Sequence, residues 1–248
     1  MLADKRVQIV VSSLVVIVIA VAAYFVFRAV EDKTPPAPDF SAYPAGKERK
    51  TQFFNYFRPI IAERNEELLA LRGRLVVLHK EKDNLSSSDI EFIRETAEHY
   101  DLDDFDVADE NAWQTLLRRV DIVPEALALA QAANESAWGT SRFAKLGNNF
   151  FGQWCYKKGC GIVPAHRGKG QKHEVADFDN PKESVLSYIN NLNYHPAYLE
   201  LRRIRETLRE NNKEITGVAL AGGLGRYSER GHEYIKELRS MIRYNKLE

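Results

Sequence analysis

Glu135 is the carboxylic acid of this chain whose setting is best suited to donating a proton. It lies in the last turn of PEALALAQAANESAW at positions 124–138, an alanine- and leucine-rich stretch that predicts a helix, and Gly139 follows as a natural stop. The carboxyl is expected to be poorly hydrated, and negative charge at a helix C-terminus is unfavourable, so both effects raise its pKa, as a general acid requires. On local features alone it could also be an ordinary surface glutamate. The neighbours expected on its helical face are Ala128, Gln131 and Ala132.

Two short motifs surround this glutamate: residues 135–139 read ESAWG and residues 148–152 read NNFFG. In type and spacing they closely resemble the glucosaminidase family, glycoside hydrolase family 73, in which a Glu followed by Ser, an aromatic residue and a Gly precedes an Asn-Asn-aromatic-aromatic-Gly turn. The resemblance extends from about Pro124 to the C-terminus. Its details, such as GQWC and GLGRYSERGHEYIKEL, are most similar to the Bax-type branch of that family. The resemblance implies a lysozyme-like helical fold and assigns the role of catalytic acid to Glu135.

Two tyrosines near the C-terminus match the family's last motif. By resemblance, Tyr227 faces the acid across the cleft and stabilises the reacting sugar, whereas from its own surroundings it would be read as a core tyrosine. Tyr234 also matches and joins the substrate-binding candidates. Seven residues later on a helix it returns to nearly the same face, which favours packing.

The second catalytic group is less clearly indicated. Glycosidases usually pair two carboxylates, about 5 Å apart with a nucleophile or roughly 6.5–9.5 Å apart with a water between them. Many relatives carry a Glu in a hairpin where this chain has no acid at positions 157–172. Glu174 and Asp177 are the nearest candidates, but Glu174 alternates with Val175 as a solvent-facing strand residue would. If neither serves, the acetamido group of the substrate attacks the anomeric carbon, and we expect this route.

Aromatic rings stack on sugar faces, and asparagine amides bond hydroxyl and acetamido groups. At least one of Phe150 and Phe151 is expected in the core, and Asn149 could instead tie its loop to the catalytic helix. The remaining substrate-binding candidates are Trp138, Asn148, Asn149, Phe151 and Trp154.

The elements that must position these residues are mainly α-helical. Residues 147–179 change to glycine, aromatic and β-branched types without helical period, which predicts loops and a short hairpin. The expected fold is therefore a lysozyme-like helical domain with a small β lobe and a cleft between them. Helical periodicity returns in residues 182–193, 196–211, 215–220 and 233–246.

Residues 7–27 carry no charge over 21 positions, and as a helix they would reach roughly 30 Å, the thickness of a bilayer core. They predict an uncleaved transmembrane span. A cleavable signal peptide is the alternative, with residues 20–22 as its small-residue site. Lys5 and Arg6 favour the cytoplasmic side for the short N-terminal tail, which places the rest of the chain in the periplasm, anchored to the inner membrane.

The chain is expected to divide into four segments. Residues 1–33 form the cytoplasmic tail and anchor, and residues 34–46, with four prolines, form a semi-rigid linker. Residues 47–120 form an accessory helical segment of open function, and residues 121–248 form the catalytic domain.

Cys155 and Cys160, with four residues between them, are expected to form a disulfide in an oxidising compartment. A metal site that adds His166 and His173 matches no standard zinc pattern, so we expect no metal and no cofactor. Lys plus Arg and Asp plus Glu both number 35, and this balance gives no attraction to nucleic acid.

The expected activity is hydrolysis of the β-1,4 bond after N-acetylglucosamine in the glycan strands of peptidoglycan. Two alternatives are open: a lytic transglycosylase, which works with one Glu, and a non-catalytic wall-binding protein. Retention of Glu135, Tyr227 and the Asn-Asn turn argues against the second.

Overall fold

The computed structural model describes residues 34–165, 170 and 172–248 and divides the chain into two units, Met1–Pro36 and Ala37–Glu248. The segment predicted to span a membrane, residues 7–27, lies outside the described residues. Among the described residues, no helix is both long enough and apolar enough to cross a bilayer. Membrane anchoring therefore stays a prediction.

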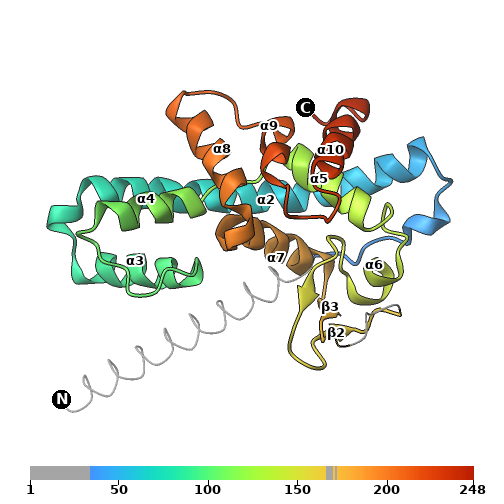
Figure 1. Cartoon of the computed structure of the whole chain (residues 1–248), viewed down its shortest axis with the longest axis horizontal. Helices are drawn as coiled ribbons and strands as arrows, with labels where there is room; N and C mark the ends of the chain where they lie inside the picture. The colour runs from blue at the N-terminus through green and yellow to red at the C-terminus, as the bar shows by residue number, and fades with distance from the viewer. Residues whose placement is uncertain (1–33, 166–169, 171) are drawn as a thin grey trace, which may run out of the picture. The chain divides into compact units, whose positions relative to one another are not determined.

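The Ala37–Glu248 unit is mainly helical with a small β lobe, as expected (Figure 1). The long helix α2 packs against α4, α5 and α7, while α9 and α10 pack on α5 (Figure 1). Four 3-10 turns, η1 to η4, cover Phe40–Ala42, Lys82–Asn84, Pro196–Tyr198 and Ala221–Gly223. The α-helices are α2 Lys47–Lys80, α3 Ser87–His99, α4 Glu110–Arg119, α5 Glu125–Glu135, α6 Arg142–Gly147, α7 Pro181–Tyr194, α8 Leu199–Glu210, α9 Gly217–Leu220 and α10 His232–Tyr244.

Helix α5 is buried from Ala126 to Ala133 because its small side chains let neighbouring helices approach on every side. It ends at Glu135, three residues before the predicted end. The Ser136 hydroxyl donates to the Ala132 carbonyl and accepts from the Gly139 amide. These two side-chain hydrogen bonds bind backbone groups at the end of the helix, where its regular backbone hydrogen bonds stop. At Gly139 the backbone has φ +74°, and a Cβ would lie 2.2 Å from the Phe40 ring, so only glycine fits. The backbone therefore turns sharply within four residues after Glu135.

The β lobe is a three-stranded antiparallel sheet of order β1-β3-β2, built from β1 Trp154–Cys155, β2 Gly161–Ile162 and β3 Glu174–Ala176. Val175 pairs with Trp154 on one side and with Ile162 on the other. A disulfide joins Cys155 to Cys160 across the loop between β1 and β2, which confirms that prediction.

A buried ionic cluster ties the segment before residue 121 to the helices after it. Asp121 is 2% exposed and accepts hydrogen bonds at 2.5 Å from Arg209 of α8. Arg205 of α8 and Arg72 of α2 lie 3.8 and 3.7 Å away from the same carboxylate. The buried Arg205 also donates to the side-chain oxygen of Asn193 at 2.7 Å. Helices α2 and α8 are thus held through one carboxylate.

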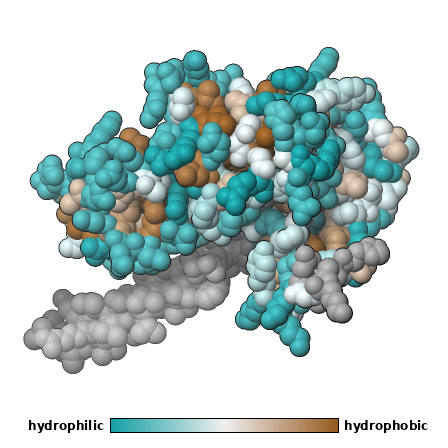
Figure 2. Space-filling view, in the orientation of Figure 1, coloured by the Kyte–Doolittle hydropathy of each residue, from teal (hydrophilic) through white to brown (hydrophobic). Residues whose placement is uncertain are grey.

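Hydrophilic side chains cover most of the face shown in Figure 2, with apolar side chains gathered in small areas between them. Few large apolar side chains of the described part are exposed, and Trp154, Tyr156 and Tyr244 are the aromatic ones among them. The full set is Leu69, Val77, Leu146, Trp154, Tyr156, Val163 and Tyr244.

Candidate active site

Glu135 ends α5 with its carboxyl largely withdrawn from solvent. Tyr234 of α10 donates its hydroxyl proton to Oε1 of Glu135 at 2.8 Å, and the amide of Asn134 donates to the same oxygen at 3.2 Å. Burial raises the pKa of Glu135 above its usual value, because desolvation of the carboxylate outweighs the opposing effect of these hydrogen bonds. The direction agrees with the expectation from sequence and suits a general acid.

The hydrogen bond from Tyr234 is the last in a series of three hydrogen bonds that begins at Tyr188. Tyr188 of α7 donates to Oε1 of Gln131 at 2.6 Å, and Nε2 of Gln131 donates to the Tyr234 hydroxyl at 3.0 Å. Since the Tyr234 oxygen accepts from Gln131, its own proton is directed to Glu135. Oε1 of Glu135 is therefore fixed as an acceptor, and Oε2 is left on the side of Gly152, where a Cβ would lie 3.8 Å from it.

Sequence reasoning missed the part played by Gln131 and Tyr188. A signal for Gln131 existed, because it is the one amide in an otherwise apolar run of α5 and lies one turn before Glu135 on the same face. Tyr234 was expected to bind substrate or to pack. It is 2% exposed, and its hydroxyl holds the acid instead.

Tyr227 lies beside this chain of hydrogen bonds. Its ring is parallel to that of Tyr234 with centroids 5.6 Å apart, and its hydroxyl donates to the carbonyl of Phe151 at 2.9 Å. Burial raises the pKa of Tyr227 well above 10, so the phenol keeps its proton near neutrality. The structure thus brings Tyr227, Tyr234 and Glu135 together.

The two asparagines of the NNFFG turn hold the backbone. Asn148 adopts a left-handed conformation at the end of α6 and donates to the Phe178 carbonyl at 2.9 Å. Asn149 is 2% exposed and donates to the carbonyls of Gln153 and Ala176. The expectation that these amides bind sugar finds no support, and Asn149 ties its turn to strand β3, not to the catalytic helix.

Both phenylalanines of this turn are buried, which confirms that at least one belongs to the core. The Phe151 ring stacks on Tyr188 with centroids 4.0 Å apart and is 1% exposed. A sugar has no access to it, so the expected stacking role of Phe151 is corrected. Its contribution to the site is the carbonyl that accepts from Tyr227.

The two predicted tryptophans remain open to a ligand. Trp154 on β1 is 56% exposed, and one ring face stacks on His173 with centroids 4.0 Å apart. Trp138 is partly buried against Phe53 and Phe54 of α2, with the ammonium of Lys50 4.9 Å from its ring centroid. Both indoles can offer an apolar face to a sugar ring.

Glu174 is buried, which differs from the expectation of a solvent-facing strand residue. Its carboxylate accepts from the backbone amides of Gly159 and Gly161 at 3.0 to 3.1 Å and so fixes the loop that the disulfide closes. Possible metal-ligand atoms of Glu174, Cys155 and Cys160 lie within 4.8 Å of one another. The two sulfurs are bonded to each other, and thiolates are the form in which cysteine binds zinc. His166, the other residue of the metal alternative, lies outside the described residues.

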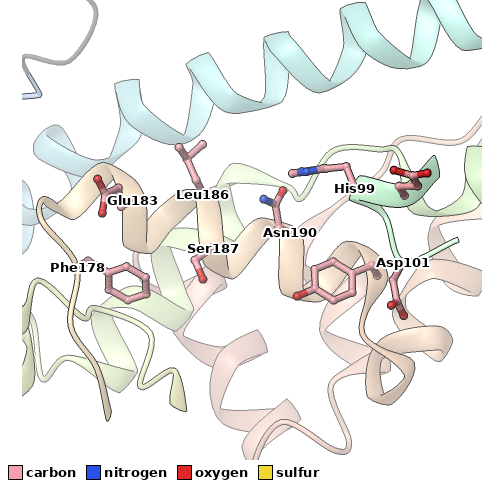
Figure 3. Close-up of a pocket in the computed structure, with 9 residues that line it drawn as sticks. His99, Asp101, Phe178, Glu183, Leu186, Ser187 and Asn190 are labelled. Atoms are coloured by element: carbon pink, nitrogen blue, oxygen red, sulfur yellow. The ribbon is translucent and has the colours of Figure 1, made fainter. Parts of the chain in front are cut away.

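A groove of about 570 Å³ lies elsewhere, along α7 near the end of α3 (Figure 3). Its wall includes Leu186, Ser187 and Asn190 of α7, with His99 and Asp101 at one end (Figure 3). None of the predicted site residues lines this groove, so it is separate from the acid.

A carboxylic acid of raised pKa, held by a phenol at the end of a buried helix in a mainly helical domain, has the properties that a proton donor requires. The chain belongs to the glucosaminidase family: residues 110–247 match the model described as mannosyl-glycoprotein endo-beta-N-acetylglucosaminidase.

The chain is also 34% identical over 213 residues to the protein bax of Escherichia coli (strain K12), a match that covers 86% of this chain and 76% of that protein. The resemblance to the Bax-type branch is thus confirmed. A match of this length cannot fit within residues 121–248, so it includes part of the preceding segment. No solved structure is significantly similar to the chain.

Proposed function

We propose that this protein hydrolyses the β-1,4 bond on the reducing side of N-acetylglucosamine in peptidoglycan, with Glu135 as the general acid. The observation that carries the proposal is the hydrogen-bonded, desolvated carboxyl of Glu135 with its raised pKa. The family to which the chain belongs supports the choice of glycosidic bond. We further propose that the helical unit is lysozyme-like, since a small β lobe stands beside the helix that ends in the acid.

In this mechanism Glu135 gives its proton to the glycosidic oxygen as the bond breaks. Oε1 is occupied as an acceptor, so Oε2 is the oxygen that presents the proton. Glu174 is committed to two backbone amides, which favours attack by the acetamido group of the substrate over a second carboxylate. Tyr227 keeps its proton and stacks on Tyr234, which holds the acid, and we assign to it the role of orienting the reacting sugar.

We propose that residues 7–27 anchor the protein in the inner membrane, with the helical unit in the periplasm. The uncharged run of 21 residues supports the anchor. The disulfide supports the compartment, because such bridges persist where the environment is oxidising.

The purified full chain, incubated with isolated sacculi, is expected to release glycan fragments that end in a reducing N-acetylglucosamine. Mass spectrometry of the fragments reads this directly, and the Glu135→Gln variant is the control. Fragments lighter by one water, with an anhydro ring on muramic acid, would instead identify a lytic transglycosylase. Absence of any cleavage by the folded wild-type chain would leave a wall-binding protein.

Replacing Tyr234 with Phe is expected to lower kcat and to move the alkaline limb of the pH profile of kcat/KM to higher pH. The hydrogen bond from Tyr234 stabilises the carboxylate, so its loss raises the pKa of Glu135 further, and the acid stays protonated to higher pH. Initial rates across the pH range check this, with Tyr156→Phe on the exposed β lobe as the matched control. A limb that stays in place in a folded Tyr234→Phe variant would contradict the role given to this phenol.

A further inference from the structure

A groove of about 380 Å³ lies between α2, the turn that follows the C-terminal end of α5, and α10. Trp138, which is three residues after Glu135, forms one wall, and Glu237 and Tyr244 of α10 form another. Both walls thus come from segments that also position Glu135: Trp138 follows the helix that ends in Glu135, and α10 carries Tyr234, which donates to Glu135.

The groove follows one face of α10. Tyr234, Glu237, Met241 and Tyr244 are spaced by three or four residues, so they share that face, and together they span about 15 Å along the helix axis. Helices α5 and α10 pack directly against each other (Figure 1). Burial raises the pKa of Glu135 most, and the charge of Glu237, which lines the groove, adds to this effect, so the groove and the acid are near each other.

The side chains of the groove combine two aromatic faces with a positive charge. The Lys50 ammonium lies 4.9 Å from the ring centroid of Trp138 and 5.0 Å from that of Tyr244, and donates to the Asn245 side chain at 3.3 Å. Tyr244 is 79% exposed, although large aromatic side chains are usually more buried.

The positive charge of Lys50 is available to a ligand. Within the described part of the chain, no carboxylate forms a salt bridge with Lys50, and Glu237 is already paired with Arg230 at 2.7 Å. Aromatic faces suit the apolar side of a pyranose, and an ammonium that has no carboxylate partner among the described residues suits the carboxylate of a ligand. The groove thus combines contacts that suit a sugar with a negative charge.

We propose that this groove is a glycan subsite next to the acid, which takes an amino sugar carrying a carboxylate: Trp138 and Tyr244 contact the ring and Lys50 pairs with the carboxylate. The inference rests on the proposed function and extends it from the bond that is cut to the sugars that are held. The carboxylate can belong to the lactyl group of the sugar or to the peptide attached to it.

Binding can be measured without cleavage on the Glu135→Gln variant, by calorimetry with three ligands. These are a chitooligosaccharide, which has no carboxylate, a glycan strand stripped of peptide, which has the lactyl carboxylate, and a strand that keeps its peptides. Tyr244→Ala is expected to weaken binding of all three roughly 3- to 10-fold. Lys50→Met is expected to weaken only the carboxylate-bearing ligands, by about 2- to 5-fold. If Lys50→Met weakens binding of the stripped strand, the carboxylate that Lys50 contacts belongs to the lactyl group. If it weakens binding of the peptide-bearing strand alone, the carboxylate belongs to the peptide.

Two matched controls lie outside the groove: Tyr156→Ala replaces an equally exposed tyrosine on the β lobe, and Lys80→Met replaces a lysine at the far end of α2. Circular dichroism verifies the fold of each variant. Unchanged affinities in folded Tyr244→Ala and Lys50→Met would overturn the subsite, as would a loss with Lys50→Met that is equal for the chitooligosaccharide. Cleavage of sacculi by the wild-type chain tests the proposed function separately, so either idea can fail alone.

Discussion

Replacing Glu135 with Gln is expected to reduce cleavage of glycan strands by roughly 100-fold or more, because the variant keeps the shape of the side chain but has no transferable proton. The amide oxygen of Gln can still accept from Tyr234, so the chain of hydrogen bonds and the fold should survive. Release of reducing ends from sacculi measures the activity, and thermal unfolding measures the stability.

Glu229→Gln is the control for this experiment, since Glu229 is an exposed glutamate of the C-terminal motif. It should retain wild-type turnover. If Glu135→Gln is folded and cleaves at close to the wild-type rate, the assignment of the acid is wrong.

Replacing Asp121 with Asn is expected to lower the free energy of unfolding by about 3–5 kcal/mol, because it leaves the buried guanidinium of Arg205 without its counter-charge. Burial alone would raise the pKa of Asp121, but the guanidinium groups of Arg209, Arg205 and Arg72 outweigh it and hold the pKa below its usual value. Burial also lowers the pKa of Arg205 to about 10. Urea denaturation measures the loss.

The sign of the pH dependence follows from the lowered pKa of Asp121. The ionised carboxylate contributes stability above the pKa that it has in the unfolded chain, and this contribution disappears as the pH falls through the lower, folded value. Wild-type protein should therefore lose this part of its stability on acidification, and Asp121→Asn should not. Glu206→Gln removes a more exposed ion pair with Arg118 and should cost at most about 1 kcal/mol. If Asp121→Asn lowers the free energy of unfolding by no more than Glu206→Gln does, the large contribution expected from the buried ionic cluster is contradicted.

Local features of the site were predictable from sequence. The alanine-rich run predicts α5, which ends within a few residues of the expected stop, and the short separation of Cys155 and Cys160 favours their disulfide. In each case the interacting residues are near one another in the sequence, so composition and spacing carry the information.

The partners of the acid were harder to predict because they come from distant elements. Tyr188 and Tyr234 lie on α7 and α10, and no periodicity says that their hydroxyls meet at Gln131. Strand β3 has only three residues, too few for alternation to show that Glu174 faces inward. The amide of an asparagine can bond a backbone carbonyl or a sugar hydroxyl equally well, so the role of Asn149 depends on the backbone groups that the fold brings next to it.

The hydrogen bond between Tyr234 and Glu135 also bears on how the protein is made. Glu135 lies near the middle of the chain, whereas its phenol partner is on the last helix. During synthesis the acid, Gln131 and Tyr188 emerge well before α10, so the face of α5 that receives this helix stays uncovered until residues 232–244 have been made. A chain that stops before residue 234 carries every residue of the ESAWG and NNFFG motifs but lacks the phenol that donates to Oε1 of Glu135. The carboxyl of Glu135 therefore receives this hydrogen bond only after α10 has been synthesised and has docked on α5.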